Sequence, residues 1–323
     1  MLRKARIILS VVIFGLITFY FLDFAEILPN SFHRLAHIQF VPALMSLSFI
    51  ILAVLILITL LLGRIYCSTI CPMGIFQDIV TWISKKTAKK KKRFRYSPAR
   101  NILRWGVLGV TAIAFLFGFT VILGLLDPYS AFGRMTVNVF KPVYMLGNNL
   151  LESIFSSFNN YTFYQVDASL LSISSFVIGL LTFLVIGFLA WKYGRIWCNT
   201  ICPVGTLLGF LSRFSLFKVR IDTEKCNHCG LCATKCKASC INSPEQTIDY
   251  SRCVDCFDCL GECRQNALSY TTPLKTEKQV TDASKRRFLL AGLTTAAATP
   301  KVMAQAQNLS LIHISEPTRP ISI

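Results

Sequence analysis

The chain has 323 residues, of which 53% are hydrophobic, and a formal net charge of +18. Its apolar runs are longer than a soluble domain of this length normally contains. The basic residues gather beside these runs, where membrane topology explains them better than nucleic-acid binding does. The composition predicts an integral membrane protein and argues against a nucleic-acid partner.

Four apolar stretches are long enough for transmembrane helices: 7–24, 41–62, 102–126 and 170–191. Lys and Arg gather before the first stretch and between the second and third, whereas the other two connections carry few. The positive-inside rule then places the N-terminus in the cytoplasm. Four spans return the C-terminal part of the chain to the same side of the bilayer, so we expect a multi-pass membrane protein.

Asp127 stands directly after the third stretch, beside Pro128 and Tyr129. An ionisable group at the membrane boundary is a candidate for handling protons. A helix-end residue in a turn is the commoner role for aspartate before proline, and it is the interpretation we favour.

A twelve-residue segment recurs along the chain. Residues 63–74 read Gly-Arg-Ile-Tyr-Cys-Ser-Thr-Ile-Cys-Pro-Met-Gly, and residues 194–205 read Gly-Arg-Ile-Trp-Cys-Asn-Thr-Ile-Cys-Pro-Val-Gly. Each copy follows a stretch that runs toward the cytoplasm, which predicts two helix pairs related by a pseudo-twofold axis. The four cysteines of the repeat would then lie at similar depth near the cytoplasmic boundary: Cys67, Cys71, Cys198 and Cys202.

Each copy ends in Cys-x-x-x-Cys-Pro, and proline favours a helix start over a helix interior, so we expect the helix to break there. Three roles are open for these thiols: a metal or cluster site joining both copies, redox-active pairs, or packing at a tight turn. The repeated flanking residues favour a redox or metal role. Arg64 and Arg195 have two interpretations, as interfacial anchors or as groups that stabilise an anionic cofactor or a lipid headgroup.

The strongest motif is a doubled run of four cysteines, with the spacing Cys-x-x-Cys-x-x-Cys-x-x-x-Cys at 226–236 and again at 253–263. This is the bacterial spacing for two [4Fe–4S] clusters, in which the fourth cysteine of each run ligates the other cluster. One cluster is thereby assigned to Cys226, Cys229, Cys232 and Cys263, and the second to Cys253, Cys256, Cys259 and Cys236. A structural zinc site is disfavoured, because zinc knuckles use paired Cys-x-x-Cys motifs with a wider gap.

The runs depart from the usual pattern in three places. Proline usually follows the fourth cysteine, whereas Lys237 follows Cys236 and no proline follows the second run. An extra thiol, Cys240, could replace Cys236 as the ligand that crosses to the other cluster. His228 stands between two ligands, and we expect it to lie at the surface or around the ligands rather than to bind iron.

These patterns predict an α-helical membrane protein with four transmembrane helices and a cytoplasmic α+β ferredoxin-like domain that holds two [4Fe–4S] clusters. The expected parts are a transmembrane domain at 1–215, the ferredoxin-like domain at 216–273 and a linker at 274–308 with a twin-arginine-like apolar segment. The final residues, 309–323, resemble translated sequencing-adapter sequence, and we expect them to be non-native.

With these motifs the chain resembles the NapH/NosR-type family of membrane polyferredoxins, the quinol-dehydrogenase membrane subunits of respiratory reductase systems. The resemblance covers about residues 1–273 and rests on the four spans, the two Cys-x-x-x-Cys-Pro motifs and the cysteine runs. It implies electron transfer between the membrane quinol pool and a redox partner protein, in the bacterial inner membrane. Cys67, Cys71, Cys198 and Cys202 match the family's membrane-edge motifs.

Two functions of different classes are open. The first is a quinol-linked electron carrier, and the second is an assembly or maturation factor that reduces a metal or cofactor during insertion into a metalloenzyme. The sequence contains no nucleophile–base constellation, Walker loop or dinucleotide motif. We therefore expect an electron carrier or a quinol dehydrogenase subunit rather than a self-contained enzyme.

Overall fold

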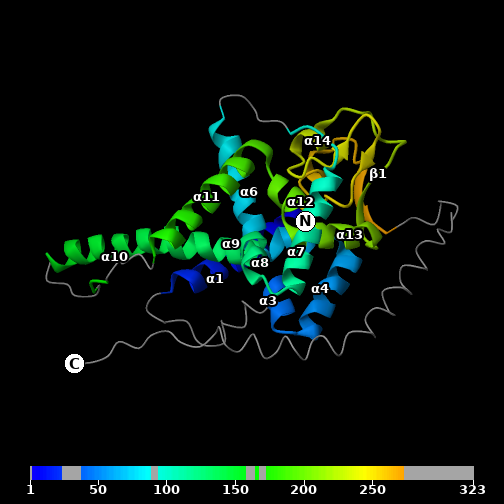
Figure 1. Ribbon diagram of the computed structural model, residues 1–323. Coiled ribbons are helices and arrows are strands. Elements are labelled where there is room, and N and C mark those ends of the chain that lie inside the picture. The colour runs from blue at the N-terminus through cyan, green and yellow to red at the C-terminus, as the bar shows by residue number, and fades with distance from the viewer. Residues whose placement is uncertain (1, 24–37, 89–93, 158–163, 167–171, 273–323) are drawn as a thin grey trace. The chain divides into compact units, whose positions relative to one another are not determined.

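Figure 1 shows a computed structural model of the chain, which describes residues 2–23, 38–88, 94–157, 164–166 and 172–272. They belong to one compact unit, Met1–Pro273. The predicted twin-arginine-like segment and non-native tail lie outside the described residues. Both stay predictions, as does a domain boundary at residue 215.

Two helices in the described part are long and apolar enough to cross a membrane by length and composition: α1 (Leu2–Leu22) and α11 (Ile173–Tyr193). They correspond to the first and fourth predicted spans. Two shorter apolar helices, α4 (Phe49–Leu62) and α7 (Asn101–Leu116), cover most of the second and third. The structure thus contains apolar helices at all four predicted positions, two of them of spanning length.

The second and third apolar stretches differ from the single helices that we expected. A short helix, α3 (Phe40–Met45), precedes α4, and the break between them holds Leu47 at a φ of 52°. The helix α8 (Thr120–Leu126) follows α7 after a break in which Gly118 adopts a φ of 80°. A glycine in this left-handed conformation is a common way to end a helix, and uniform apolar composition does not reveal it.

Beyond the third stretch the chain continues as helix through α9 (Pro128–Met135), the π-helical segment η2 (Thr136–Phe140) and α10 (Lys141–Ser156). Asp127 caps α9, and its Oδ2 accepts hydrogen bonds from the amide and the hydroxyl of Ser130, each at 2.7 Å. The carboxylate therefore has the helix-end role that we favoured.

The two copies of the repeat fold alike. In the first, α5 (Ile65–Thr69) stops before α6 (Pro72–Thr87), and in the second, α12 (Ile196–Thr200) stops before α13 (Pro203–Leu211). A 3-10 turn, η3 (Ser212–Phe214), follows α13. Proline opens α6 and α13, and the preceding cysteine, Cys71 or Cys202, is the N-cap residue. The predicted helix break at each Cys-Pro is confirmed.

The cysteine-rich region has mixed α and β structure. Its elements are β1 (Lys218–Ile221), α14 (Leu231–Lys235), β2 (Ile241–Asn242), β3 (Thr247–Ile248), the 3-10 turn η4 (Leu260–Glu262) and β4 (Leu268–Thr271). The first and last strands pair antiparallel, with Lys218 opposite Thr271, and β2 pairs with β3. Pairing of β1 with β4 closes the region on itself.

This region packs on the end of α4. The amides of Leu216 and Phe217 donate to the carbonyls of Leu60 and Leu61, and the hydroxyl of Tyr270 donates to the carbonyl of Leu62. In Figure 1 the region lies beside α12 and α13, at one end of the helices. The helix ends that carry the repeated cysteines are therefore close to the doubled cysteine run.

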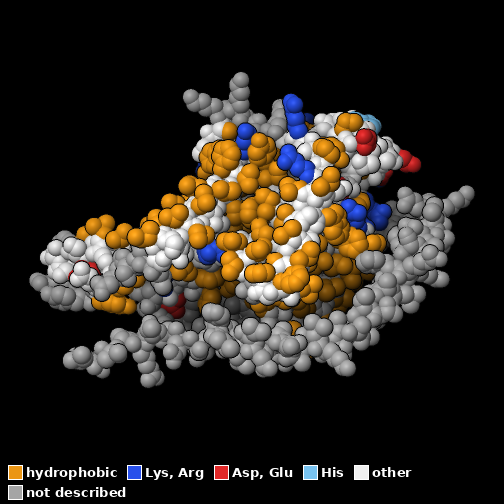
Figure 2. Space-filling model, viewed as in Figure 1, with side chains coloured by type: hydrophobic (Ala, Val, Ile, Leu, Met, Phe, Trp, Pro, Cys, Tyr) orange, Lys and Arg blue, Asp and Glu red, His pale blue; other side chains and the backbone are white. Residues whose placement is uncertain are grey.

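The helices expose large apolar side chains. Ile50 on α4 and Ile102 on α7 are 82% and 93% exposed, and α11 exposes several more. Figure 2 shows hydrophobic side chains covering much of one face of the molecule, with most of its Lys and Arg side chains toward the top and right of the view. Apolar surface on this scale suits lipid contact and supports association with a membrane.

Candidate iron–sulfur centres

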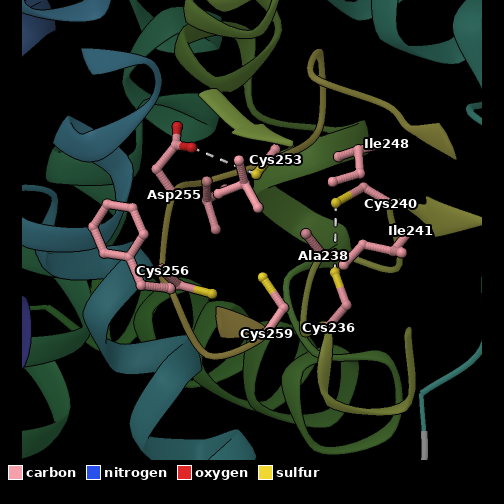
Figure 3. Close-up of a pocket in the computed structure, with 12 residues that line it drawn as sticks. Cys236, Ala238, Cys240, Ile241, Ile248, Cys253, Asp255, Cys256 and Cys259 are labelled. Carbon is pink, nitrogen blue, oxygen red and sulfur yellow. Dashed lines mark hydrogen bonds between the residues drawn. The ribbon is translucent and has the colours of Figure 1, made fainter. Parts of the chain in front are cut away.

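Five thiols line one buried pocket in the cysteine-rich region: Cys236, Cys240, Cys253, Cys256 and Cys259. Figure 3 shows them around the pocket, together with apolar side chains such as Ile241 and Ile248. The three thiols of the second run thus meet the fourth thiol of the first, as the bacterial rule assigns them. The pocket offers the ligands and the dry surroundings that a [4Fe–4S] cluster uses.

The extra thiol belongs to the same pocket. The sulfurs of Cys236 and Cys240 lie 3.4 Å apart, so either of them can reach the crossing position. Both alternatives that the sequence left open are compatible with this geometry. The assignment of Cys236 over Cys240 stays a prediction.

The second group of thiols is more exposed. Cys229 is exposed, and Cys226, Cys232 and Cys263 are partly buried. Burial raises the pKa of Cys232, and the charges of Cys226, Cys229 and Cys263 raise it further, which shows that the four thiols are neighbours. The structure thus brings together the four residues assigned to the other cluster, and their binding of iron stays a prediction.

His228 is occupied by polar neighbours rather than by these thiols. Its Nδ1 lies 3.3 Å from the carbonyl of Ser243, and its Nε2 lies 3.1 Å from Nε2 of Gln246. Both ring nitrogens therefore have polar neighbours, and the expectation that His228 does not bind iron stays a prediction.

The four repeat cysteines are all buried at the helix ends. Burial raises the pKa of Cys71, followed by the charges of Cys198 and Cys67, so thiols from both copies are electrostatic neighbours. Burial raises the pKa of the Cys202 thiol, and the charges of Cys198, Cys71 and Cys67 raise it further. The structure brings the two copies together, as the repeat predicted, and leaves the chemical role of the four thiols untested.

Arg64 and Arg195 are fully buried, so the interpretation of these residues as interfacial anchors is wrong. Each guanidinium reaches the opposite copy of the repeat. Arg64 donates to the carbonyl of Cys198 at 3.4 Å, and Arg195 donates to the carbonyl of Cys67 at 2.7 Å. Hydropathy marked the helix ends but gave no sign that these cations turn inward.

An ion-pair network that sequence reasoning missed centres on Asp78 of α6. Its carboxylate lies 2.7 Å from Arg195 Nε, 3.2 Å from Arg6 Nη1 and 3.3 Å from Lys237 Nζ. Burial alone would raise the pKa of Asp78, but the three cations outweigh burial and hold the pKa below its usual value. Lys237 also pairs with Asp258 at 2.9 Å.

The network joins the first helix, both copies of the repeat and the pocket of the second cysteine run. It also accounts for lysine where proline usually follows the fourth cysteine. One sequence signal was available, because Asp78 is the only acidic residue between Glu26 and Asp127.

The repeated glycines at the start of each copy leave room for the cysteine-rich region. Gly63 has a φ of 78° and a ψ of −155°, and a Cβ there would lie 2.3 Å from Oδ2 of Asp255. Gly194 has a φ of 73°, and its Cβ would lie 2.6 Å from the carbonyl oxygen of Lys237. Both copies thus use glycine to dock against a loop of the buried pocket.

We expect Gly63→Ala to destabilise the protein by about 1–3 kcal/mol, because its backbone conformation is essentially restricted to glycine. Gly106→Ala in α7 is the matched control, since a Cβ there meets nothing within 4 Å and alanine favours helix. Thermal unfolding in detergent measures both variants. Equal midpoints for the two variants would contradict the docking role of Gly63.

Within the described ranges, no three His, Cys, Asp or Glu side chains lie close enough together to hold a single metal ion. In a [4Fe–4S] cluster each thiolate binds a different iron, so the ligands surround a larger volume. The five thiols around the pocket provide the kind of ligand that a [4Fe–4S] cluster takes.

The family model described as a 4Fe-4S binding domain matches the chain twice, at residues 44–91 and 175–222. Both matches fall on the copies of the repeat rather than on the doubled cysteine run. The putative electron transport protein YccM of Escherichia coli is 24% identical over 252 residues, which are 78% of this chain and 61% of YccM.

Two further relatives carry names of the family that the motifs indicated. The ferredoxin-type protein NapH of Haemophilus influenzae is 22% identical over 70% of this chain and 69% of its own length. The regulatory protein NosR of Stutzerimonas stutzeri is 23% identical over 62% of this chain, which spans 23% of NosR. The chain is similar to the NapH/NosR-type polyferredoxins, as its motifs indicated.

These similarities support an iron–sulfur electron-transfer role. No solved structure gives a significant match to the chain. Because the chain spans 61% of YccM and less than a quarter of NosR, the activities of the whole relatives come to it only as proposals.

Proposed function

We propose that this polyferredoxin relays single electrons between the membrane quinol pool and a redox partner protein, through two [4Fe–4S] clusters held by the doubled cysteine run. The observation that carries the proposal is the division of the thiols into a more exposed group, which includes Cys229, and a group around a buried pocket. Electrons can then enter at one surface and leave toward another.

The two groups are neighbours. Burial raises the pKa of Cys259 in the buried pocket, and Cys256, Cys253, Cys236 and Cys232 raise it further. Cys232 belongs to the exposed group, so the two groups approach each other through these residues. Short spacing between the two centres is what transfer of single electrons requires.

The exposed group suits a protein partner, because Cys229 lies at the surface. The buried pocket lies against the ends of the apolar helices, through Asp255 and Lys237, and suits exchange with the membrane. When bound, the clusters supply the one-electron chemistry. The protein supplies the thiolates, the dry pocket and the charges around it.

In this proposal all four apolar stretches cross the bacterial inner membrane, two of them as broken helices. The N-terminus and the ferredoxin-like domain face the cytoplasm, where thiols stay reduced and clusters are assembled. Breaks in a spanning helix are tolerated where neighbouring helices bind the freed backbone groups. Cysteine labelling from either side of intact cells would test the orientation.

The test is the iron content and redox behaviour of the protein purified anaerobically in detergent. We expect the doubled run to bind about eight irons, and Cys229→Ser and Cys256→Ser each to lose about four. His228→Ala is the matched control and should lose none. Reduced samples should show electron paramagnetic resonance (EPR) signals of interacting [4Fe–4S] clusters.

A quinol analogue added to the oxidised protein decides between the two functional classes. Reduction of the clusters would support the respiratory function. Clusters that ignore quinol at all accessible potentials would favour the assembly-factor alternative, and zinc in place of iron would contradict electron transfer altogether.

A further inference from the structure

We propose that the two copies of the repeat together form a third iron–sulfur site, with Cys67, Cys71, Cys198 and Cys202 as its ligands. A [4Fe–4S] cluster takes four thiolates, and each copy supplies two. Neither copy is therefore a complete site, although the matched family model covers each of them separately. This inference goes beyond the two clusters of the proposed function and does not depend on quinol.

Contacts that cross between the copies hold the two half-sites together. The Arg64 guanidinium lies 3.8 Å from Sγ of Cys67 in its own copy and donates to the carbonyl of Cys198 and to Oδ1 of Asn199 in the other. In the opposite direction, Arg195 of the second copy donates to the carbonyl of Cys67 in the first. The pseudo-twofold relation predicted for the helix pairs is thus repeated in the side chains.

The second glycine of each copy is needed for the same contacts. A Cβ at Gly74 would lie 2.2 Å from the carbonyl oxygen of Cys67, and one at Gly205 would lie 2.0 Å from that of Cys198. The chain therefore folds back over its first cysteine so closely that only glycine fits. The arginine, both cysteines and the second glycine of the repeat, Gly-Arg-x-x-Cys-x-x-x-Cys-Pro-x-Gly, then all have a place in building one shared site.

The site has donors directed at its sulfurs. Gln77 Nε2 from the first copy lies 3.2 Å from Sγ of Cys198 in the second, and the amide of Gly205 donates to Sγ of Cys202 at 3.3 Å. Cys71 and Cys202 also stand at the N-termini of α6 and α13, where the helix dipole favours a thiolate. Hydrogen bonds to ligand sulfurs are a usual means of stabilising an iron–sulfur cluster.

Unsatisfied groups point to a missing anion. Arg64 is fully buried, yet its guanidinium makes no ion pair with a carboxylate among the described residues. Its Nε and the Nη2 of Arg195 are buried donors without a hydrogen-bond partner in the part of the chain that the structure describes. A buried cation without a counter-charge costs several kcal/mol, and a cluster with four thiolates is anionic.

The site lies beside the buried pocket of the second cysteine run. The amide of Arg64 donates to Oδ2 of Asp255 at 2.9 Å, and the amide of Arg195 donates to the carbonyl of Lys237 at 3.1 Å. Asp255 and Lys237 are sequence neighbours of ligands to the buried cluster. The third site therefore places a further cluster between the buried pocket and the apolar helices. In electron transfer, one electron passes from a reduced cluster to the next oxidised cluster, and no bond is made or broken.

Iron and acid-labile sulfide in the anaerobically purified full-length protein test the inference without any variant. We expect about twelve irons per chain, four more than the doubled run binds. A count of about eight, with quinol reduction intact, would overturn the third site and leave the proposed function standing. Zinc measured in the same sample must not account for the thiols of the repeat.

Variants from the two copies test whether the site is shared. Cys71→Ser and Cys202→Ser should each lose about four irons, and the double variant should lose no more than either single variant. The EPR signals of the two ferredoxin clusters should persist in all three, which shows that the protein still folds. Additive losses, or no loss from one copy, would contradict a single shared site; Ser212→Ala, outside the motif, is the control.

Discussion

Replacing Asp78 with asparagine is expected to destabilise the protein by about 3–5 kcal/mol, because it removes one partner of a buried ion-pair network. The variant leaves Arg195, whose side chain is fully buried, without the carboxylate that lies 2.7 Å from its Nε. Arg6 and Lys237 lose the same partner. An amide of nearly the same shape keeps the packing, so the measured change reports the charge.

Denaturant or thermal unfolding in detergent measures the effect. Glu245→Gln removes an acidic charge from an exposed position of the cysteine-rich region and should change stability little. If Asp78→Asn lowers the free energy of unfolding by no more than Glu245→Gln does, the ion-pair network does not stabilise the packing of the helices against the cysteine-rich region.

The grouping of the ferredoxin cysteines could be predicted because it follows from local turns. In each run the first three cysteines are three residues apart and can bind the same cluster. The fourth cysteine follows four residues after the third and binds the other cluster. The structure places Cys236 and Cys240 at the pocket that the second run lines, and the assignment of the crossing ligands stays a prediction. The helix breaks at the two Cys-Pro pairs were equally local, because proline restricts its own backbone.

The helix breaks at residues 46–48 and 117–119 could not be located in this way. A uniformly apolar stretch has no period, so nothing in it separates a straight helix from two shorter ones. Gly118 ends α7 in a left-handed conformation, but Gly106, Gly109 and Gly124 lie nearby in helix. Only the packed structure decides which of these glycines ends the helix.

The ion-pair network was missed because its partners are far apart in sequence. Arg6 and Arg195 are 72 and 117 residues from Asp78. A single sequence shows that Asp78 is isolated among apolar and basic residues, which suggests a buried partner without identifying it. The burial of Arg64 and Arg195 likewise depends on partners far away in sequence, because each guanidinium donates to a carbonyl of the opposite copy.

The two copies are not equivalent around their cysteines. Cys67 and Cys198 are 131 residues apart, so the counterparts of Gln77 and Asp78 are Leu208 and Gly209. A side chain at Gly209 would meet the carbonyl of Ser251 at 2.4 Å, which leaves no space for a second carboxylate. The first copy therefore supplies the hydrogen bond to the Cys198 sulfur and the charge network, and the second supplies close contact with the cysteine-rich region.

Lys237→Met is expected to make the buried cluster harder to reduce, with a reduction potential lower by on the order of 50 mV. Lys237 is next to a predicted ligand, and its Nζ lies 2.9 Å from Asp258, which stands between two others. Its side chain is mostly buried, so water screens its charge weakly. A positive charge near a cluster stabilises the reduced form, which carries one more negative charge.

A redox titration followed by EPR measures the potentials of both clusters. Lys235→Met is the matched control, because Lys235 is two residues away with an exposed ammonium group and should shift the potential little. Lys237→Pro, which restores the residue that usually follows the fourth cysteine, should lower the potential as methionine does. An unchanged or raised potential in both Lys237 variants would mean that the lysine serves only to join Asp78 to Asp258, and that the charge of the buried cluster is balanced elsewhere.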